Sequence, residues 1–377
     1  MSVRQFTREV RQDIGEIVDV VTGTMNAIGR ELVELGDEPA RVRQGLVAAV
    51  STILATTLAL LLELQSPWWA AISGFMSLMS TGSGSVRRAL LRLTGTIAGA
   101  LLGFVMARWL PYDLFAFYLF LGGATMLSVL AMQVSPHGLA WLFLTITSIL
   151  VLLMSLNDPQ LAFEIACNRV LEVGVGVTAA IITARLLQDW YAEPPPVAPG
   201  WRHLLGAQWP AVLHGLRSAI AVVAVMLVWV LFDPPEVTEM AITVAMVMSA
   251  PVIAGTNLDT RHAVAQRSIF RFIGCLLGGV LALGVLALDI TSFVWWLATL
   301  GAGVWLCMHV QVGRHGVGYV GTQAGMVFII TLVQGAAPPE SIMPGIGRFV
   351  GIVGGLAILL VVSLLIWPTE EERAQAS

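Results

Sequence analysis

"RALLRLTGTIAGA" at residues 88–100 has a counterpart in "RSIFRFIGCLLGG" at residues 267–279. In each stretch, Arg-x3-Arg is followed by a glycine three residues on and by another glycine four residues later. Arginines at this spacing share one face of a helix, and most of the positions around them are apolar. The recurrence indicates that the chain contains a duplicated helical unit.

The composition is that of a membrane protein. Of the 377 residues, 57% are hydrophobic and only 12% are charged, whereas soluble chains carry about 25% charged residues. Many apolar runs exceed the roughly 18 residues that mark a membrane-spanning helix. All basic residues are arginine, which excludes lysine-dependent sites such as Walker phosphate loops and Schiff-base enzymes. The sequence therefore predicts an all-α polytopic membrane protein.

Twelve apolar segments predict about twelve transmembrane helices, six in each half. They fall at about 46–64, 68–80, 89–110, 114–132, 138–156, 161–187, 213–232, 238–254, 268–288, 292–310, 317–334 and 341–367. The shift that aligns the two opening stretches also pairs Arg169 with Arg348 and Gly176 with Gly355. Six crossings is an even number, so the repeats should be parallel and related by a pseudo-twofold axis along the membrane normal.

These segments divide the chain into five parts. Residues 1–41 form an amphipathic helix, cytoplasmic or interfacial, that lies on the membrane surface or packs on the membrane domain. The first six-helix repeat is 42–190, a proline-rich cytoplasmic connector is 191–210, the second repeat is 211–368 and a cytoplasmic tail is 369–377. If every segment crosses, the arginine-bearing loops share one side and leave only Arg108 clearly opposite. The positive-inside rule then places both termini in the cytoplasm.

The first half resembles a known transporter family. It runs from "RQGLVAAVSTILATTLALLLELQSPWWAAISG" through "RALLRLTGTIAGALLGF" to "NRVLEVGVGVTAAIITARLL". This order is similar to that of the fusaric acid resistance and aromatic acid exporter proteins and, more distantly, of the plant aluminium-activated malate transporters. The resemblance covers 41–190 well and 210–368 more loosely. In the second half, "DPPEVTE" stands in place of the Pro-Trp motif and "GRFVG" in place of the Asn-Arg-x2-Glu motif. It implies a bacterial inner-membrane exporter of aromatic carboxylates or a conductor of organic anions.

Arg169 and Arg348 are the first candidates for substrate binding. Each lies ten residues after a proline at the expected outer membrane edge, about 15 Å along a helix that rises 1.5 Å per residue. The hydrocarbon core is about 30 Å thick, so both guanidinium groups should approach the midplane, where burial costs roughly 2.5–3.5 kcal/mol. A symmetric arginine pair would bind a carboxylate bidentately.

The alternative for Arg169 is a structural ion pair with Glu172, one turn on, or with Glu164. Arg348 should have no such neighbour, since Gly351 replaces the glutamate in the second half. A carboxylate in the membrane can also alternate between protonated and ionised forms, so Glu172 and Glu164 are the candidates for proton coupling. Protonating Glu172 would free Arg169 for substrate, and anion and proton would then bind cooperatively.

Arg92 and Arg271 lie one turn inside their spans, at the cytoplasmic end. They form either a basic vestibule that gathers anionic substrate by electrostatic steering, or snorkelling side chains that contact lipid phosphate. Trp68 and Trp69 are expected in the aromatic belt at the outer interface.

The leading hypothesis is an exporter of organic carboxylates driven by the proton gradient. A passive organic-anion channel would use the same arginines without a titrating carboxylate, and a non-transporting membrane scaffold is the third alternative. No nucleophile, metal cluster or paired carboxylates point to an enzyme, and no cofactor, metal or nucleic-acid partner is expected. The expected partners are the organic anion and membrane lipid. A periplasmic adaptor protein is a third partner that the sequence leaves open.

Overall fold

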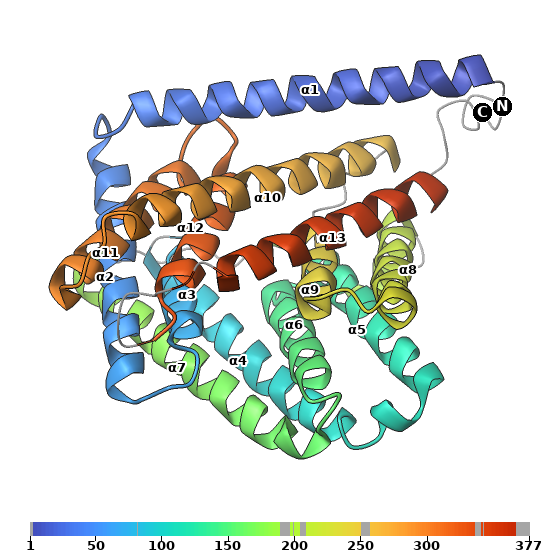
Figure 1. Ribbon diagram of the computed structural model, residues 1–377, viewed down its shortest axis with the longest axis horizontal. Helices are drawn as coiled ribbons and strands as arrows, with labels where there is room; N and C mark the ends of the chain where they lie inside the picture. Colours follow the sequence, from blue (N-terminus) through green and yellow to red (C-terminus); the bar gives the residue numbers. More distant parts are fainter. Residues whose placement is uncertain are drawn as a thin grey trace.

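The computed structural model describes most of the chain and confirms the all-α prediction (Figure 1). Within the described residues there are thirteen α-helices and no strand. Arg373, the predicted tail 369–377 and most of the connector 191–210 lie outside them. The described residues are 3–80, 82–188, 197–198, 200–203, 209–249, 257–335, 341 and 343–366.

A helix occurs at each apolar segment that the sequence predicts, and one more, α1 (Val3–Val33), precedes them. The first half contains α2 (Pro39–Leu61), α3 (Pro67–Ser77), α4 (Gly82–Met106), α5 (Leu114–Val134), α6 (Gly138–Met154) and α7 (Ala162–Leu187). The second half contains α8 (Trp209–Phe232), α9 (Val237–Met248), α10 (Asn257–Leu286), α11 (Phe293–Gln311), α12 (Gly318–Leu332) and α13 (Met343–Ile366).

Helix length separates two classes in each half. Among the described residues, eight helices are long and apolar enough to cross a membrane: α2, α4, α5, α7, α8, α10, α11 and α13. The second and fifth helices of each half, α3, α6, α9 and α12, have 11, 17, 12 and 15 residues. At 1.5 Å per residue these are shorter than a hydrocarbon core of about 30 Å. The chain is a multi-pass membrane protein in which long helices alternate with short ones.

The helix contacts recur between the halves. Helix α4 packs along α6 as α10 does along α12, and α3 packs on α7 as α9 does on α13. Contacts between the halves include those of α2 with α11 and of α5 with α8. The short helices meet in the middle of the bundle, where Trp69 of α3 clusters with Ile146 of α6 and Ile242 of α9. Figure 1 draws α3, α6 and α9 between α2 on one side and α8 on the other.

Glycines set the spacing of α4 on α6 and of α10 on α12. A Cβ atom added at Gly274 would lie 2.6 Å from the backbone oxygen of Val320, and one added at Gly95 would overlap the backbone oxygen of Ala140. Such close approach of two helix backbones requires a residue without a side chain. These glycines therefore lie in the packing surfaces between the helices.

Helix α1 packs on the membrane domain through its C-terminal turns. Ala27 and Ile28 are buried in a cluster with Phe270 of α10 and with Val310 of α11. In Figure 1, α1 runs along one edge of the bundle, beside α10. Of the two predictions for this amphipathic helix, packing on the domain is therefore confirmed for its described C-terminal part.

Candidate functional site

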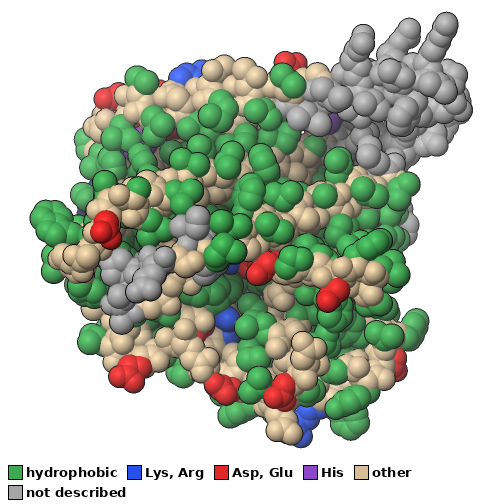
Figure 2. Space-filling view, in the orientation of Figure 1, with side chains coloured by type: hydrophobic (Ala, Val, Ile, Leu, Met, Phe, Trp, Pro, Cys, Tyr) green, Lys and Arg blue, Asp and Glu red, His purple; other side chains and the backbone are tan. Residues whose placement is uncertain are grey.

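Two arginines from opposite halves meet at one tryptophan. Arg169 lies on α7 and Arg348 on α13, and the guanidinium carbon of each is 5.9 Å from the centre of the Trp68 ring. The guanidinium of Arg169 also lies 4.1 Å above the ring of Trp69. Both arginines are more than nine-tenths buried. On the face drawn in Figure 2, basic side chains lie at the bottom of a hollow next to α13.

Each of the two arginines forms an ion pair with a glutamate. Nη1 of Arg169 is 3.0 Å from Oε2 of Glu172, and Nη1 of Arg348 is 2.7 Å from Oε1 of Glu239. The other oxygen of Glu172 accepts a hydrogen bond of 2.9 Å from the backbone N–H of Ser66. Pairing of this kind offsets most of the cost of burying a charged group.

The carboxylate beside Arg348 corrects one expectation from the sequence. Arg348 was expected to have no acidic neighbour, because Gly351 stands where the first half has a glutamate. The glutamate comes instead from α9, and Gly351 makes room for it: a Cβ atom there would lie 2.7 Å from Cβ of Glu239. The missing side chain on α13 thus allows α9 to bring its own carboxylate to the arginine.

Glu164 lies apart from the arginine pair. It is exposed near the start of α7, and its Oε1 accepts a hydrogen bond of 2.7 Å from Nε2 of Gln65. Of the two acidic partners suggested for Arg169, the structure provides Glu172 only.

The two tryptophans are not in an outer aromatic belt, contrary to the prediction. Trp69 is buried among α6 and α9, and its ring stacks on Trp68 with the centres 4.4 Å apart. Since α3 is short and central, its first turn lies inside the bundle, and these rings line the surroundings of the arginines.

Arg92 and Arg271 are also interior residues, which contradicts the snorkelling alternative. Their exposed fractions are 3% and 1%, so neither guanidinium reaches lipid phosphate. Arg92 donates from Nε to Oγ of Ser73 at 3.1 Å and from Nη1 to Sδ of Met76 at 3.2 Å. Its guanidinium carbon lies 4.2 Å from the centre of the Phe143 ring.

Arg271 has stronger polar partners. Its Nη1 donates to Oε1 of Gln323 at 2.7 Å, and its Nη2 donates to Oγ1 of Thr243 at 3.1 Å. Both partners are buried side chains, on α12 and α9. A carboxamide oxygen and a hydroxyl thus solvate this cation inside the bundle.

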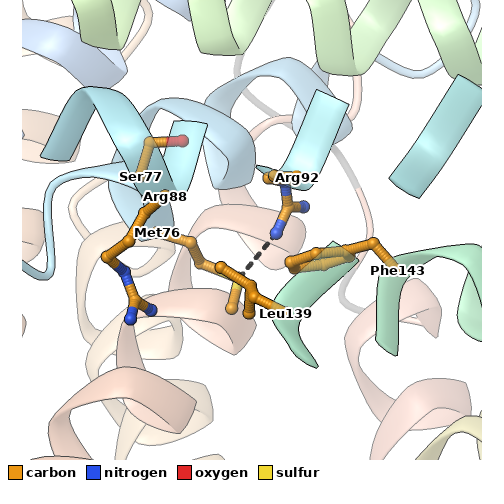
Figure 3. A pocket seen from close by; sticks show the side chains of 6 residues that line it. All are labelled: Met76, Ser77, Arg88, Arg92, Leu139 and Phe143. Carbon is orange, nitrogen blue, oxygen red and sulfur yellow. Dashed lines mark hydrogen bonds between the residues drawn. The ribbon is translucent and has the colours of Figure 1, made fainter. Parts of the chain in front are cut away.

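A pocket adjoins Arg92 (Figure 3). Its cavity volume is about 10 Å³, roughly the space of one water molecule, and it is lined by Met76, Ser77, Arg88, Arg92, Leu139 and Phe143. Figure 3 shows the guanidinium of Arg92 turned toward the Phe143 ring and the Met76 sulfur, with Arg88 on the other side of Met76. The pocket combines two basic side chains with apolar ones.

A second polar cluster joins α1 to the membrane domain. Arg41 of α2 contacts the buried carboxylate of Glu31 and lies 3.4 Å from Oε2 of Glu34. Nε2 of His315 lies 2.9 Å from Oε1 of Glu34, and this hydrogen bond is the main reason that the pKa of Glu34 falls below its ordinary value. The three groups Glu31, Glu34 and His315 are close enough to hold a metal, but Arg41 already supplies positive charge there.

Four residues of the arginine surroundings were not singled out from the sequence: Glu239, Thr243, Phe143 and Gln323. One signal for Glu239 existed, since an acidic residue inside an apolar segment is expensive to bury and usually has a partner. No comparable signal marked the others, because their contacts form only when the short helices pack together.

One comparison with known proteins relates part of the chain to a known family. Residues 54–183 match the family described as fusaric acid resistance protein-like. The matched stretch includes Trp68, Arg92, Arg169 and Glu172, and it confirms the resemblance seen in the sequence. No curated protein and no solved structure matches the chain.

Proposed function

We propose that this chain, with its segment of the fusaric acid resistance protein-like family, exports organic carboxylates across the bacterial inner membrane and prefers aromatic ones. The observation that carries the proposal is the convergence of Arg169 and Arg348 on Trp68. A guanidinium group binds a carboxylate through two parallel hydrogen bonds, and an indole face stacks on an aromatic ring. Both halves of an aromatic acid thus find a complementary surface at one place.

In this structure glutamates of the protein itself form ion pairs with both arginines. Removing a partner from a buried arginine is strongly unfavourable, so the arginines need a negative charge at every stage of transport. Substrate binding is then an exchange, in which the carboxylate of the substrate replaces Glu172 at Arg169 or Glu239 at Arg348. This exchange keeps the affinity moderate, as release on the far side requires.

Glu172 connects the exchange to proton movement. A glutamate displaced from Arg169 is buried without its counter-charge, and taking up a proton removes that cost. Anion and proton therefore favour each other's binding and move in the same direction. The sequence analysis led to the hypothesis that the proton gradient drives export. Coupling of this kind does not use an inward proton gradient to drive export. Instead, export follows the outward gradient of the substrate and is faster when the exterior is alkaline.

The proposed architecture is twelve crossings in two parallel repeats, with both termini in the cytoplasm. Contacts at corresponding positions support it. A Cβ atom at Gly355 would lie 2.7 Å from the backbone oxygen of Met240, and one at Gly176 would overlap the backbone oxygen of Ala70. The short central helices would then reach the membrane surfaces through the loops that precede and follow them.

Further support comes from the ends of the first helix in each half. The chain leaves α2 at Glu63 and α8 at Asp233 with left-handed φ angles of 53° and 45°. Non-glycine residues rarely adopt this conformation, so its occurrence at matching places favours duplication.

The test is efflux from reconstituted liposomes loaded with benzoate, cyclohexanecarboxylate or acetate, with protein-free liposomes to subtract leakage of the neutral acids. We expect protein-dependent efflux that is fastest for benzoate and that rises as the external pH rises. A passive channel would give efflux that does not change with external pH, and a scaffold would give no efflux above the protein-free control. Either result overturns the proposal.

A further inference from the structure

Arg92 is a buried cation that has no negative partner in the part of the chain that the structure describes. Among the described residues no acidic side chain forms an ion pair with it, whereas Arg169 and Arg348 each have a glutamate. Its contacts are a hydroxyl, a thioether and an aromatic face. These are weak partners for a charge that is 3% exposed, and burying a charge without a strong partner is costly.

The second half has a polar side chain at the position that faces its arginine. Gly95 packs against the backbone oxygen of Ala140, and Gly274 packs against that of Val320. In that register Phe143 occupies the place of Gln323. The carboxamide of Gln323 is uncharged, but its oxygen accepts a hydrogen bond of 2.7 Å from Arg271. At the matching position, Phe143 contacts Arg92 only through the face of its ring.

The hydroxyl partners match in the same way. Gly176 packs against Ala70 and Ser73, and Gly355 packs against Met240 and Thr243. Ser73 therefore corresponds to Thr243, and both hydroxyls contact the arginine of their half. The two arginine sites differ in the facing residues of α6 and α12, because Phe143 and Leu139 stand where the second half has Gln323 and Tyr319.

We infer that the pocket beside Arg92 is an anion subsite present only in the first half, and that it takes the carboxylate group of an organic monocarboxylate. Arg92 supplies the charge, Arg88 lies at the pocket wall, and Met76, Leu139 and Phe143 form its apolar surfaces. The inference rests on the proposed function and adds a step to it.

The position of the pocket gives it a role in the transport path. Ser73, which contacts Arg92, lies one helical turn along α3 from Trp69, which contacts Arg169. In the proposed orientation the C-terminal end of α3 faces the cytoplasm. A carboxylate bound at Arg92 would therefore be next to the arginine pair on the cytoplasmic side, and the pocket is the entry subsite of the export path.

The exchange of the two wall residues tests the inference directly. Benzoate binding to the purified full-length protein is measured by titration calorimetry for wild type, Phe143→Gln, Phe143→Leu and Gln323→Phe. Phe143→Gln places a carboxamide oxygen against Arg92, as in the second half, and should weaken binding about 10- to 100-fold, the range for loss of a charge-assisted hydrogen bond. Phe143→Leu removes the ring without adding a cap and should weaken binding less.

Gln323→Phe should have the opposite effect, because it removes the cap from Arg271. We expect one additional benzoate bound per chain. Equal affinities for wild type and Phe143→Gln, with benzoate efflux from wild-type liposomes intact, would overturn the entry subsite and leave the proposed function standing. Absence of both benzoate binding and benzoate efflux in wild type would overturn both.

Discussion

The two halves of this molecule share a framework and differ in its polar contacts. Corresponding glycines hold corresponding helices together, and corresponding arginines point into the centre. In the first half Arg169 is paired within its own helix by Glu172 and covered by Trp69. In the second half Arg348 is paired by Glu239 from α9, the residue that occupies the place of Trp69.

This difference indicates that packing residues and site residues have separate constraints in a membrane protein whose two halves have recurring helix contacts. A glycine that touches a backbone oxygen cannot be replaced without moving a helix, so both copies keep it. A residue beside an arginine can be exchanged if another group supplies the charge. The arginines thus have different partners around a similar frame, and the site is asymmetric.

The largest expected effect comes from breaking the ion pair that is specific to the second half. Glu239→Gln leaves Arg348 buried without a carboxylate and should lower the free energy of unfolding by about 3–5 kcal/mol. The measurement is unfolding in detergent. The matched control is Glu38→Gln, since the pair of Glu38 with Arg314 is largely exposed and should contribute less than about 1 kcal/mol. Similar losses in the two variants would show that the central pair is not buried as described.

Adjacent glycines on α10 test the shared framework. A Cβ atom at Gly278 would overlap the backbone oxygen of Ala324, whereas one at Gly279 would meet open space. Gly278→Ala should therefore cost about 1–3 kcal/mol through overpacking, and Gly279→Ala should be neutral or stabilising by up to about 1 kcal/mol. Unfolding midpoints measured side by side decide this, and a loss of stability in Gly279→Ala alone would contradict the packing of α10 on α12.

The next prediction concerns proton coupling, which the proposed function assigns to Glu172 in the first half. Glu172→Gln mimics the protonated glutamate, so it should keep efflux of benzoate down its gradient while removing the rise with external pH. Efflux is measured at several external pH values in wild type and in the variant. If the variant retains the full pH dependence, Glu172 is only a structural partner of Arg169.

The smallest expected effect concerns α1, which has no counterpart among the described residues of the second half. The hydrogen bond from His315 lowers the pKa of Glu34 from its ordinary value of 4.5, so the contribution of this contact is complete above pH 4.5 and is lost as the pH falls below it. The protection of the amides in the last turns of α1 from hydrogen exchange, relative to their intrinsic rate at each pH, should therefore fall at acidic pH. Glu34→Gln should remove that pH step, and an unchanged step would place the titrating group elsewhere.

Much of the fold could be predicted from local sequence. Apolar runs mark the helices because each must satisfy its backbone hydrogen bonds internally in lipid. The pair of Arg169 with Glu172 was also accessible, since residues three apart on a helix are neighbours.

The contacts between helices could not be predicted from local sequence. The partner of Arg348 lies on α9, more than a hundred residues earlier in the chain, and the burial of Arg92 depends on how α3 and α6 pack beside it. The short lengths of α3 and α9 moved Trp68 and Trp69 from the expected interface into the bundle. Hydropathy alone does not reveal these depths, because short and long apolar helices have similar composition.

The most direct test of the central claim is benzoate efflux from liposomes containing Arg348→Gln, compared with Arg108→Gln. Arg108 is an exposed residue whose guanidinium lies against Phe104, and it is the matched arginine outside the site. The double variant Arg348→Gln/Glu239→Gln leaves no unpaired charge and controls for folding. We predict that Arg348→Gln and the double variant lose at least about tenfold in efflux rate, the effect of one charge-assisted hydrogen bond, while Arg108→Gln stays near wild type. Equal rates in all three variants would show that the carboxylate does not bind at the arginine pair.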